Sequence, residues 1–205
     1  PQHFALLMSE LGQKLRAQGK LLTAAVVSLG YNADGILTEV FNDVDFLNLM
    51  AYDASGNDHS PYSYAVSSLD YWLGRGLPKS KAVLGVPFYG RNPYKAYNTL
   101  LAEGANPDAD VFNNIYYNGR VTMKKKTQLA MERASGIMIW ELSMDATGNN
   151  SLLNVIKTTS GDPCNPDLIA PVVNITAPAN NASVKVGTEV TLAATATDSD
   201  GTITN

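Results

Sequence analysis

The stretch DFLNLMAYD, residues 45–53, is a short apolar run that ends in a tyrosine and an aspartate. A single asparagine is the only polar residue inside it, which predicts a strand buried on both faces, as in parallel sheets covered by helices. Gly-Asn-Asp at residues 56–58 ends the pattern and places Tyr52 and Asp53 at the carboxyl end of the strand. Parallel α/β proteins bind ligands at that end. Taken alone, Asp53 is better explained as the cap of a turn.

Outward from this strand, residues 1–159 alternate between helical and strand patterns. Helices are predicted at 1–18, 60–76, 122–134 and 152–156. Strands are predicted at 21–28, 45–53, 81–90 and 136–142, of which the first two are expected to be buried. This alternation is typical of a parallel α/β fold. No glycine-rich phosphate loop follows a strand, which argues against a nucleotide ligand.

Smaller features within this part also give expectations. Residues 30–34 are predicted as loop, and residues 38–41 allow only a short helix. Ser60 and Pro61 are expected to begin the second helix as its N-cap and first residue. Trp72, at helical spacing, is expected in the core rather than as a sugar platform. Four tyrosines in the irregular segment 92–121 are equally compatible with lining a groove and with packing the loop: Tyr94, Tyr97, Tyr116 and Tyr117.

Composition excludes several classes of function. The chain has 205 residues, 45% of them hydrophobic and 17% charged, with a net charge of −4, which gives no reason to expect nucleic acid. The one basic run, residues 124–126, is expected on a solvated helix face. No stretch approaches the ~20 apolar residues of a membrane span. A single cysteine, Cys164, and two distant histidines, His3 and His59, predict no metal site and no disulfide within the chain.

The composition changes near residue 160. Residues 160–171 hold three prolines and are predicted to be a linker. Residues 172–205 alternate apolar and polar side chains, as antiparallel strands with one buried face do. Strands are expected around 173–175, 184–186 and 190–194, with turns at 178–182 and 198–201. This resembles the start of an immunoglobulin-like sandwich, of which ~100 residues would be needed.

Three motifs together resemble the chitinases of glycoside hydrolase family 18. Met50-Ala51-Tyr52-Asp53 is similar to the Met-x-Tyr-Asp that ends strand six in this family. Residues 85–90 match its Gly-x-Pro-Phe-Tyr-Gly of strand seven, and Trp140 matches the tryptophan of strand eight. The resemblance implies that residues 1–159 are the carboxyl-terminal half, strands five to eight, of a (β/α)8 TIM barrel. The tail resembles modules of secreted bacterial polysaccharide-degrading enzymes, which implies a secreted protein.

The resemblance also implies a chemistry without cofactor or metal. In this family the acetamido carbonyl of the substrate attacks its own anomeric carbon. Tyr52 would hydrogen-bond the acetamido group and Asp53 would orient it, which makes these the expected catalytic pair. Trp140 would stack beneath the sugar ring. The resemblance implies that three further residues complete the wall that binds chitin or chito-oligosaccharides: Met50, Tyr89 and Arg91.

One family motif has no counterpart in these 205 residues. Strand four of the family ends in Asp-x-x-Asp-x-Asp-x-Glu, whose glutamate is the general acid, and residues 42–45 do not match it. The acid is therefore expected upstream of Pro1. This chain alone is expected to be inactive, poorly stable and in need of the amino-terminal half-barrel. Only 45 residues separate Arg91 from Ile137, which predicts a shallow groove without an inserted domain.

Three other interpretations remain open. A non-catalytic chitin-binding lectin on the same scaffold would keep the pocket and lack the glutamate, although Tyr52 and Asp53 together favour an enzyme. An enzyme acting on N-linked glycans usually departs from Tyr-Asp at strand six and ranks lower. An unrelated parallel α/β protein ranks last, because three motifs occur in the family's order.

Overall fold

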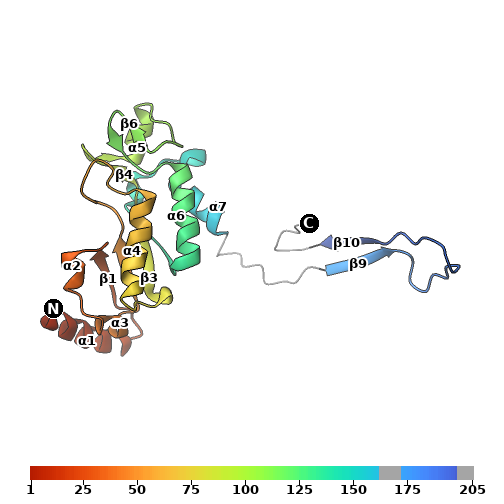
Figure 1. Ribbon diagram of the computed structural model, residues 1–205, viewed down its shortest axis with the longest axis horizontal. Helices are drawn as coiled ribbons and strands as arrows, with labels where there is room; N and C mark the ends of the chain where they lie inside the picture. Colours follow the sequence, from red (N-terminus) through yellow and green to blue (C-terminus); the bar gives the residue numbers. More distant parts are fainter. Residues whose placement is uncertain (162–171, 198–205) are drawn as a thin grey trace. The chain divides into compact units, whose positions relative to one another are not determined.

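A computed structural model describes residues 1–161 and 172–197 of the chain (Figure 1). The contacts divide the chain into two compact units, Pro1–Ser160 and Gly161–Asn205. The first unit contains all the family-like motifs and is described first. Most of the predicted linker, including Cys164, lies outside the described residues.

The centre of the first unit is a four-stranded sheet whose neighbouring strands are all parallel, as the sequence predicted. Its order is β1–β2–β3–β8. The strands are β1 (Thr23–Val27), β2 (Phe46–Met50), β3 (Ala82–Pro87) and β8 (Gly136–Trp140). Val27 pairs with Met50 and Pro87 pairs with Trp140, so the strands end close together. The residues that follow them are consequently brought to one edge of the sheet.

Helices α4 (Tyr62–Gly74) and α6 (Arg120–Arg133) contact each other and β3, and they lie beside it in Figure 1. Trp72 of α4 is fully buried, and its indole N–H donates to the carbonyl of Ser28 at 2.9 Å. It is therefore a core residue, as predicted. The other helices of the unit are α1 (Gln2–Arg16), α2 (Tyr31–Asp34), α3 (Val40–Asp43), α5 (Tyr97–Ala102) and α7 (Leu152–Ser160), with short 3-10 turns η1 (Lys79–Lys81), η2 (Leu142–Met144) and η3 (Gly148–Asn150).

The prediction of strands buried on both faces is wrong for β1 and β2, whereas β3 is buried along nearly its whole length. In β2, Leu47 and Leu49 are fully buried, whereas Phe46, Asn48 and Met50 are half-buried. Successive strand residues point to opposite faces, so one face is covered by helices and the other only in part. In β1 most residues are exposed or half-buried, because β1 has a single neighbour in the described sheet.

Three local predictions are also wrong. Residues 31–34 form the single helical turn α2 instead of loop. Ser60 does not cap α4: Pro61 precedes the helix, and the Ser60 hydroxyl donates to the carbonyl of Ala51 at 2.7 Å. Of the three lysines at residues 124–126, the first two are exposed but Lys126 is fully buried. Its hydrogen bonds to groups distant in sequence, given below, explain why helical periodicity could not reveal it.

The irregular segment 92–121 folds over the ends of the central strands. It holds α5 and parts of two small antiparallel ribbons: β4 (Tyr89–Gly90) with β5 (Lys95–Ala96), and β6 (Val111–Phe112) with β7 (Ile115–Tyr116). Within this segment the side chains of Tyr97 and Tyr117 are buried, and the Tyr97 hydroxyl donates to the carbonyl of Asn150 at 3.1 Å. These two tyrosines pack the loop, whereas Tyr94 remains 54% exposed.

The second unit contains one antiparallel ribbon among its described residues, formed by β9 (Val172–Ala177) and β10 (Ala193–Thr197). Val184 and Val186, predicted as a strand, lie outside both strands and are exposed. The predicted buried face is not seen in residues 172–197, because a sandwich face is buried only by a second sheet. The predicted turn at 198–201 lies outside the described residues.

Gly85 of β3 gives the first testable prediction. A Cβ atom on Gly85 would lie 2.4 Å from the carbonyl oxygen of Leu49 and 3.1 Å from the ring of Tyr52. We therefore expect Gly85→Ala to lower the free energy of unfolding by about 1–3 kcal/mol, the usual cost of overpacking. Urea unfolding measures this. Gly74→Ala, where a Cβ would meet nothing within 4 Å, is the control, and equal stability of the two variants would contradict the prediction.

Candidate functional site

Side chains that follow β2 and β3 meet in one cluster at the carboxyl ends of the strands. The Tyr89 hydroxyl donates to Oδ1 of Asp53 at 2.6 Å, and the Arg91 guanidinium lies 2.9 Å from the same oxygen. The rings of Tyr52 and Tyr89 contact edge to face, with centroids 6.2 Å apart. Of the predicted site residues, these four lie in direct contact with one another.

The cluster keeps Asp53 negatively charged. Partial burial acts to raise the pKa of Asp53, but the Tyr89 hydroxyl and the Arg91 guanidinium more than offset it and hold the pKa below its usual value. Burial, reinforced by the Asp53 carboxylate, raises the pKa of Tyr89 well above its usual range. The site therefore holds an ionised carboxylate next to a phenol that stays protonated and donates a hydrogen bond to it.

The hydroxyl of Tyr52 has only a weak hydrogen-bond acceptor in the described part of the chain. Its closest partner is the thioether sulfur of Met138, at 3.9 Å, which is a weak acceptor. Burial and the charge of Asp53 raise the pKa of Tyr52 to about 12, so the phenol stays protonated at neutral pH. A protonated phenol beside an anionic carboxylate is suited to hold and orient a polar neutral group such as an amide.

Two exposed aromatic side chains border the cluster. Trp140, the last residue of β8, is 52% exposed, and its backbone carbonyl accepts the N–H of Phe88 at 2.8 Å. The ring of Tyr94 lies tilted against that of Tyr89, with ring centroids 4.6 Å apart. Burial is the largest influence on Tyr94 and raises the pKa of its phenol, while a hydrogen bond with the Trp140 side chain acts to lower it. Large exposed aromatic faces at a strand end are suited to stacking on a sugar ring.

Met50 is the predicted site residue that lies apart from this cluster. It is half-buried in β2 and lines a separate hollow beside β1, together with Phe4 and Ile36. Its position on the strand follows from the sequence, but its side chain is not among the contacts of Asp53 or Tyr89 in the described part of the chain.

Sequence reasoning missed His59 and gave Tyr94 no definite role. His59 is fully buried, and its ring lies 3.4 Å from Oδ1 of Asp53 and tilted against Tyr89, with ring centroids 4.9 Å apart. A lone histidine in a loop gave no ligand pattern. The signal available was its place six residues after the strand-end aspartate, in the turn that must fold back over it.

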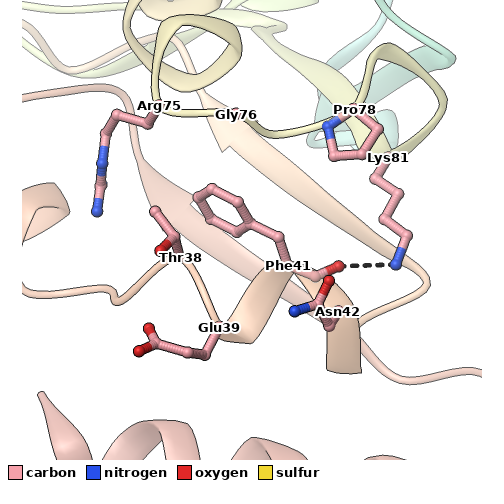
Figure 2. Close-up of a pocket in the computed structure, with 8 residues that line it drawn as sticks. All are labelled: Thr38, Glu39, Phe41, Asn42, Arg75, Gly76, Pro78 and Lys81. Carbon is pink, nitrogen blue, oxygen red and sulfur yellow. Dashed lines mark hydrogen bonds between the residues drawn. The ribbon is translucent and has the colours of Figure 1, made fainter.

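The opposite end of the strands has a different character. A hollow of about 570 Å³ lies there. Within it, Arg75 and Lys81 lie on either side of Phe41 (Figure 2). The Lys81 ammonium donates to the carbonyls of Phe41 and Val44 at 2.7 and 2.8 Å. The Arg75 guanidinium donates to the carbonyls of Ala33 and Ile36. Both cations thus bind carbonyl groups in and next to the helical turns α2 and α3, so this hollow is a structural feature.

Among residues 1–161 and 172–197, no three side chains of the histidine, cysteine, aspartate or glutamate type are grouped so as to hold an ion. No helix in the same ranges combines the length and the apolar character that crossing a bilayer requires.

Comparison with known proteins adds two family matches. The model for glycosyl hydrolases family 18 matches residues 1–145, and a bacterial Ig domain model matches residues 171–205. The crystal structure of the family 18 chitinase ChiB from the chitin utilization locus of Flavobacterium johnsoniae is similar, with a TM-score of 0.70 and 36% identity over 76% of this chain and 55% of that one. A chitinase from Bacteroides thetaiotaomicron has a TM-score of 0.63 and 32% identity over 68% of this chain and 52% of that one.

Among curated sequences, Endochitinase 1 of Metarhizium anisopliae is 26% identical over 174 residues, which is 58% of this chain and 40% of that protein. The chain spans less than half the length of the curated relatives it matches, and a little more than half of the two solved structures.

Proposed function

Because the chain belongs to glycosyl hydrolases family 18, we propose that it is part of a secreted chitinase that hydrolyses β-1,4-linked N-acetylglucosamine chains. The observation that carries this proposal is the Tyr52–Asp53–Tyr89–Arg91 cluster at the ends of β2 and β3. The names of the similar structures, both chitinases, support the same substrate.

In the proposed reaction the substrate supplies its own nucleophile. The acetamido carbonyl oxygen attacks the anomeric carbon as the glycosidic bond breaks, and water later opens the resulting ring with overall retention. The protonated Tyr52 hydroxyl donates to the acetamido group, and the Asp53 carboxylate accepts its N–H and stabilises the positive charge that develops there. Holding a group in attack geometry lowers a barrier by several kcal/mol. Tyr89 and Arg91 keep the Asp53 carboxylate in place and charged.

The leaving oxygen needs a general acid, which we propose is a glutamate outside these 205 residues. The family motif Asp-x-x-Asp-x-Asp-x-Glu is not found in this sequence. We further propose that β1, β2, β3 and β8 are strands five to eight of a barrel. Two observations support this: the strands are all parallel, and β1 and β8 each have one neighbour in the described sheet. Residues 172–205 would then begin an immunoglobulin-like module, as the bacterial Ig match supports.

The second candidate is a chitin-binding protein on the same scaffold. The exposed rings of Trp140 and Tyr94 favour it, since both would serve binding equally well without hydrolysis. The test is to incubate chito-oligosaccharides with the protein that contains this chain together with its upstream residues. We expect new reducing ends with the β configuration. Proton NMR recorded during the reaction measures this. Tight binding without cleavage would establish the lectin and exclude the enzyme.

Trp140 provides a prediction for substrate affinity. Removing its exposed indole by Trp140→Ala should raise KM for chito-oligosaccharides by about tenfold or more, as expected when an aromatic anchor of a binding site is lost. Trp140→Phe, which keeps a ring face, should raise KM much less. Steady-state kinetics of the two variants measure this. Equal KM values for alanine and phenylalanine would show that the ring does not contact the sugar.

A further inference from the structure

A buried set of polar groups joins helix α6 to the loop that follows β2. The Lys126 ammonium donates to the carbonyl of Ser60 at 2.7 Å, to its hydroxyl at 2.7 Å and to Oδ1 of Asn118 at 2.6 Å. Asn118 also donates to the Ser60 carbonyl at 2.9 Å, and the Ser60 hydroxyl donates to the carbonyl of Ala51. Ser60 is therefore fixed between α6 and the end of β2.

His59, next to this anchor, makes two hydrogen bonds that point to the site. Its Nδ1 lies 3.3 Å from the backbone nitrogen of Asp53, and its Nε2 lies 3.2 Å from the carbonyl oxygen of Tyr89. The Asp53 N–H can only donate, so Nδ1 must accept and Nε2 must carry the proton that is donated to Tyr89. The geometry thus selects one neutral tautomer and links the ends of β2 and β3.

The surroundings of His59 favour this neutral form. Burial is the largest influence and lowers the pKa of His59. The bond to the Tyr89 carbonyl and the carboxylates of Asp53 and Asp58 oppose burial, while the charge of Lys126 adds to it. A protonated ring would carry a hydrogen on Nδ1, which would face Oδ1 of Asp53 at 3.4 Å but would lose the Asp53 N–H as a partner.

Asp53 needs such support because its backbone is unusual. Its φ of 61° lies in the left-handed region, which non-glycine residues adopt only when their surroundings hold them there. The neighbouring Ala54 N–H donates to the carbonyl of His59 at 2.9 Å and closes the loop on itself. In this conformation the Asp53 amide donates to Nδ1 of His59, while its carboxylate contacts Tyr89 and Arg91.

We propose that His59 is a positioning residue: through Nδ1 it fixes the backbone of Asp53, and Ser60, clamped by Lys126 of α6, fixes His59. This inference rests on the proposed function of Asp53 and adds three residues to it: His59, Ser60 and Lys126. Neither His59 nor Lys126 needs to touch the substrate, since both are fully buried.

Two substitutions separate the two hydrogen bonds of His59. His59→Asn places an amide oxygen near the position of Nδ1 and keeps an acceptor for the Asp53 N–H. His59→Gln places an amide nitrogen near the position of Nε2 and keeps only the donor to Tyr89. Both variants are made in the protein that contains this chain and its upstream residues. We expect kcat to stay within about threefold for asparagine and to fall about tenfold to a hundredfold for glutamine, with KM little changed. Small misplacements of a catalytic group have effects of this size. Equal kcat values, or a lower kcat for asparagine, would overturn the proposal.

A second measurement needs no variant and no activity. Nitrogen-15 NMR of the His59 ring in the unmodified protein should show a neutral imidazole with the proton on Nε2 at pH 7. A proton on Nδ1, or an imidazolium, would overturn the inference. Absence of chitin hydrolysis by the unmodified protein would instead count against the proposed function, and the ring spectrum would still decide whether His59 holds Asp53 as described.

Discussion

Asp53→Asn is expected to lower kcat for chito-oligosaccharides by about a hundredfold to a thousandfold, the range seen when one preorganised electrostatic group of a site is removed. The carboxylate is held in its charged form by the Tyr89 hydroxyl and the Arg91 guanidinium. An asparagine has nearly the same shape but no charge, so it can no longer stabilise the positive charge that develops on the acetamido group. KM should change much less, because the loss is felt mainly in the transition state.

The matched control for this variant is Asp70→Asn. Asp70 lies on the exposed face of α4 and pairs with Arg133 at 2.6 Å, far along the helix from the strand ends. The control should leave kcat and KM unchanged, because Asp70 is outside the site and the loss of an exposed ion pair changes stability little. Steady-state kinetics of the two variants, in the protein that contains the upstream residues, measure the difference. A kcat for Asp53→Asn within a few-fold of the control would remove Asp53 from the catalytic group.

Raising the pH from about 7 to 10 is expected to stabilise the first unit by up to about 4 kcal/mol, because each of the three pH units contributes at most about 1.36 kcal/mol. Burial lowers the pKa of Lys126 from 10.5 to about 7. The unfolded chain therefore binds more protons than the folded chain throughout this interval, and stability rises with pH wherever that holds. Below about pH 7 the cost of burying the charge is fully present. Above pH 10 the trend reverses, because burial raises the pKa values of Tyr52 and Tyr117 to about 12.

Substitution of Lys126 distinguishes this explanation from a general effect of pH. Lys126→Met removes the titrating group, so the increase in the free energy of unfolding between pH 7 and 10 should largely disappear. Lys125→Met, at an exposed position of the same helix, should preserve it. Urea unfolding at several pH values measures both slopes. An unchanged slope in Lys126→Met would show that the buried ammonium does not control the pH dependence.

The local pattern of the sequence determined the order of the elements and the ends of the strands. Apolar runs that stop at turn residues predicted β2 and β3, and so placed Tyr52, Asp53, Tyr89 and Arg91 at one edge of a parallel sheet. Such inferences succeed because strand period, helix period and turn chemistry depend on residues close together in the chain. The family motifs then supplied the expected chemistry of the same residues.

Tertiary structure alone decided which polar groups are buried and what they contact. The sequence predicts a solvated side chain for Lys126. In the structure its ammonium donates to the carbonyl of Ser60, which is 66 residues away in sequence. From the sequence, His59 is only a histidine in a loop. In the structure its Nε2 hydrogen-bonds to the carbonyl of Tyr89, which is 30 residues away in sequence. Burial of β1 and β2 was overestimated for the same reason, because an apolar strand does not encode what covers its second face. The energy of a buried polar group depends on partners brought together by folding, and no local pattern contains them.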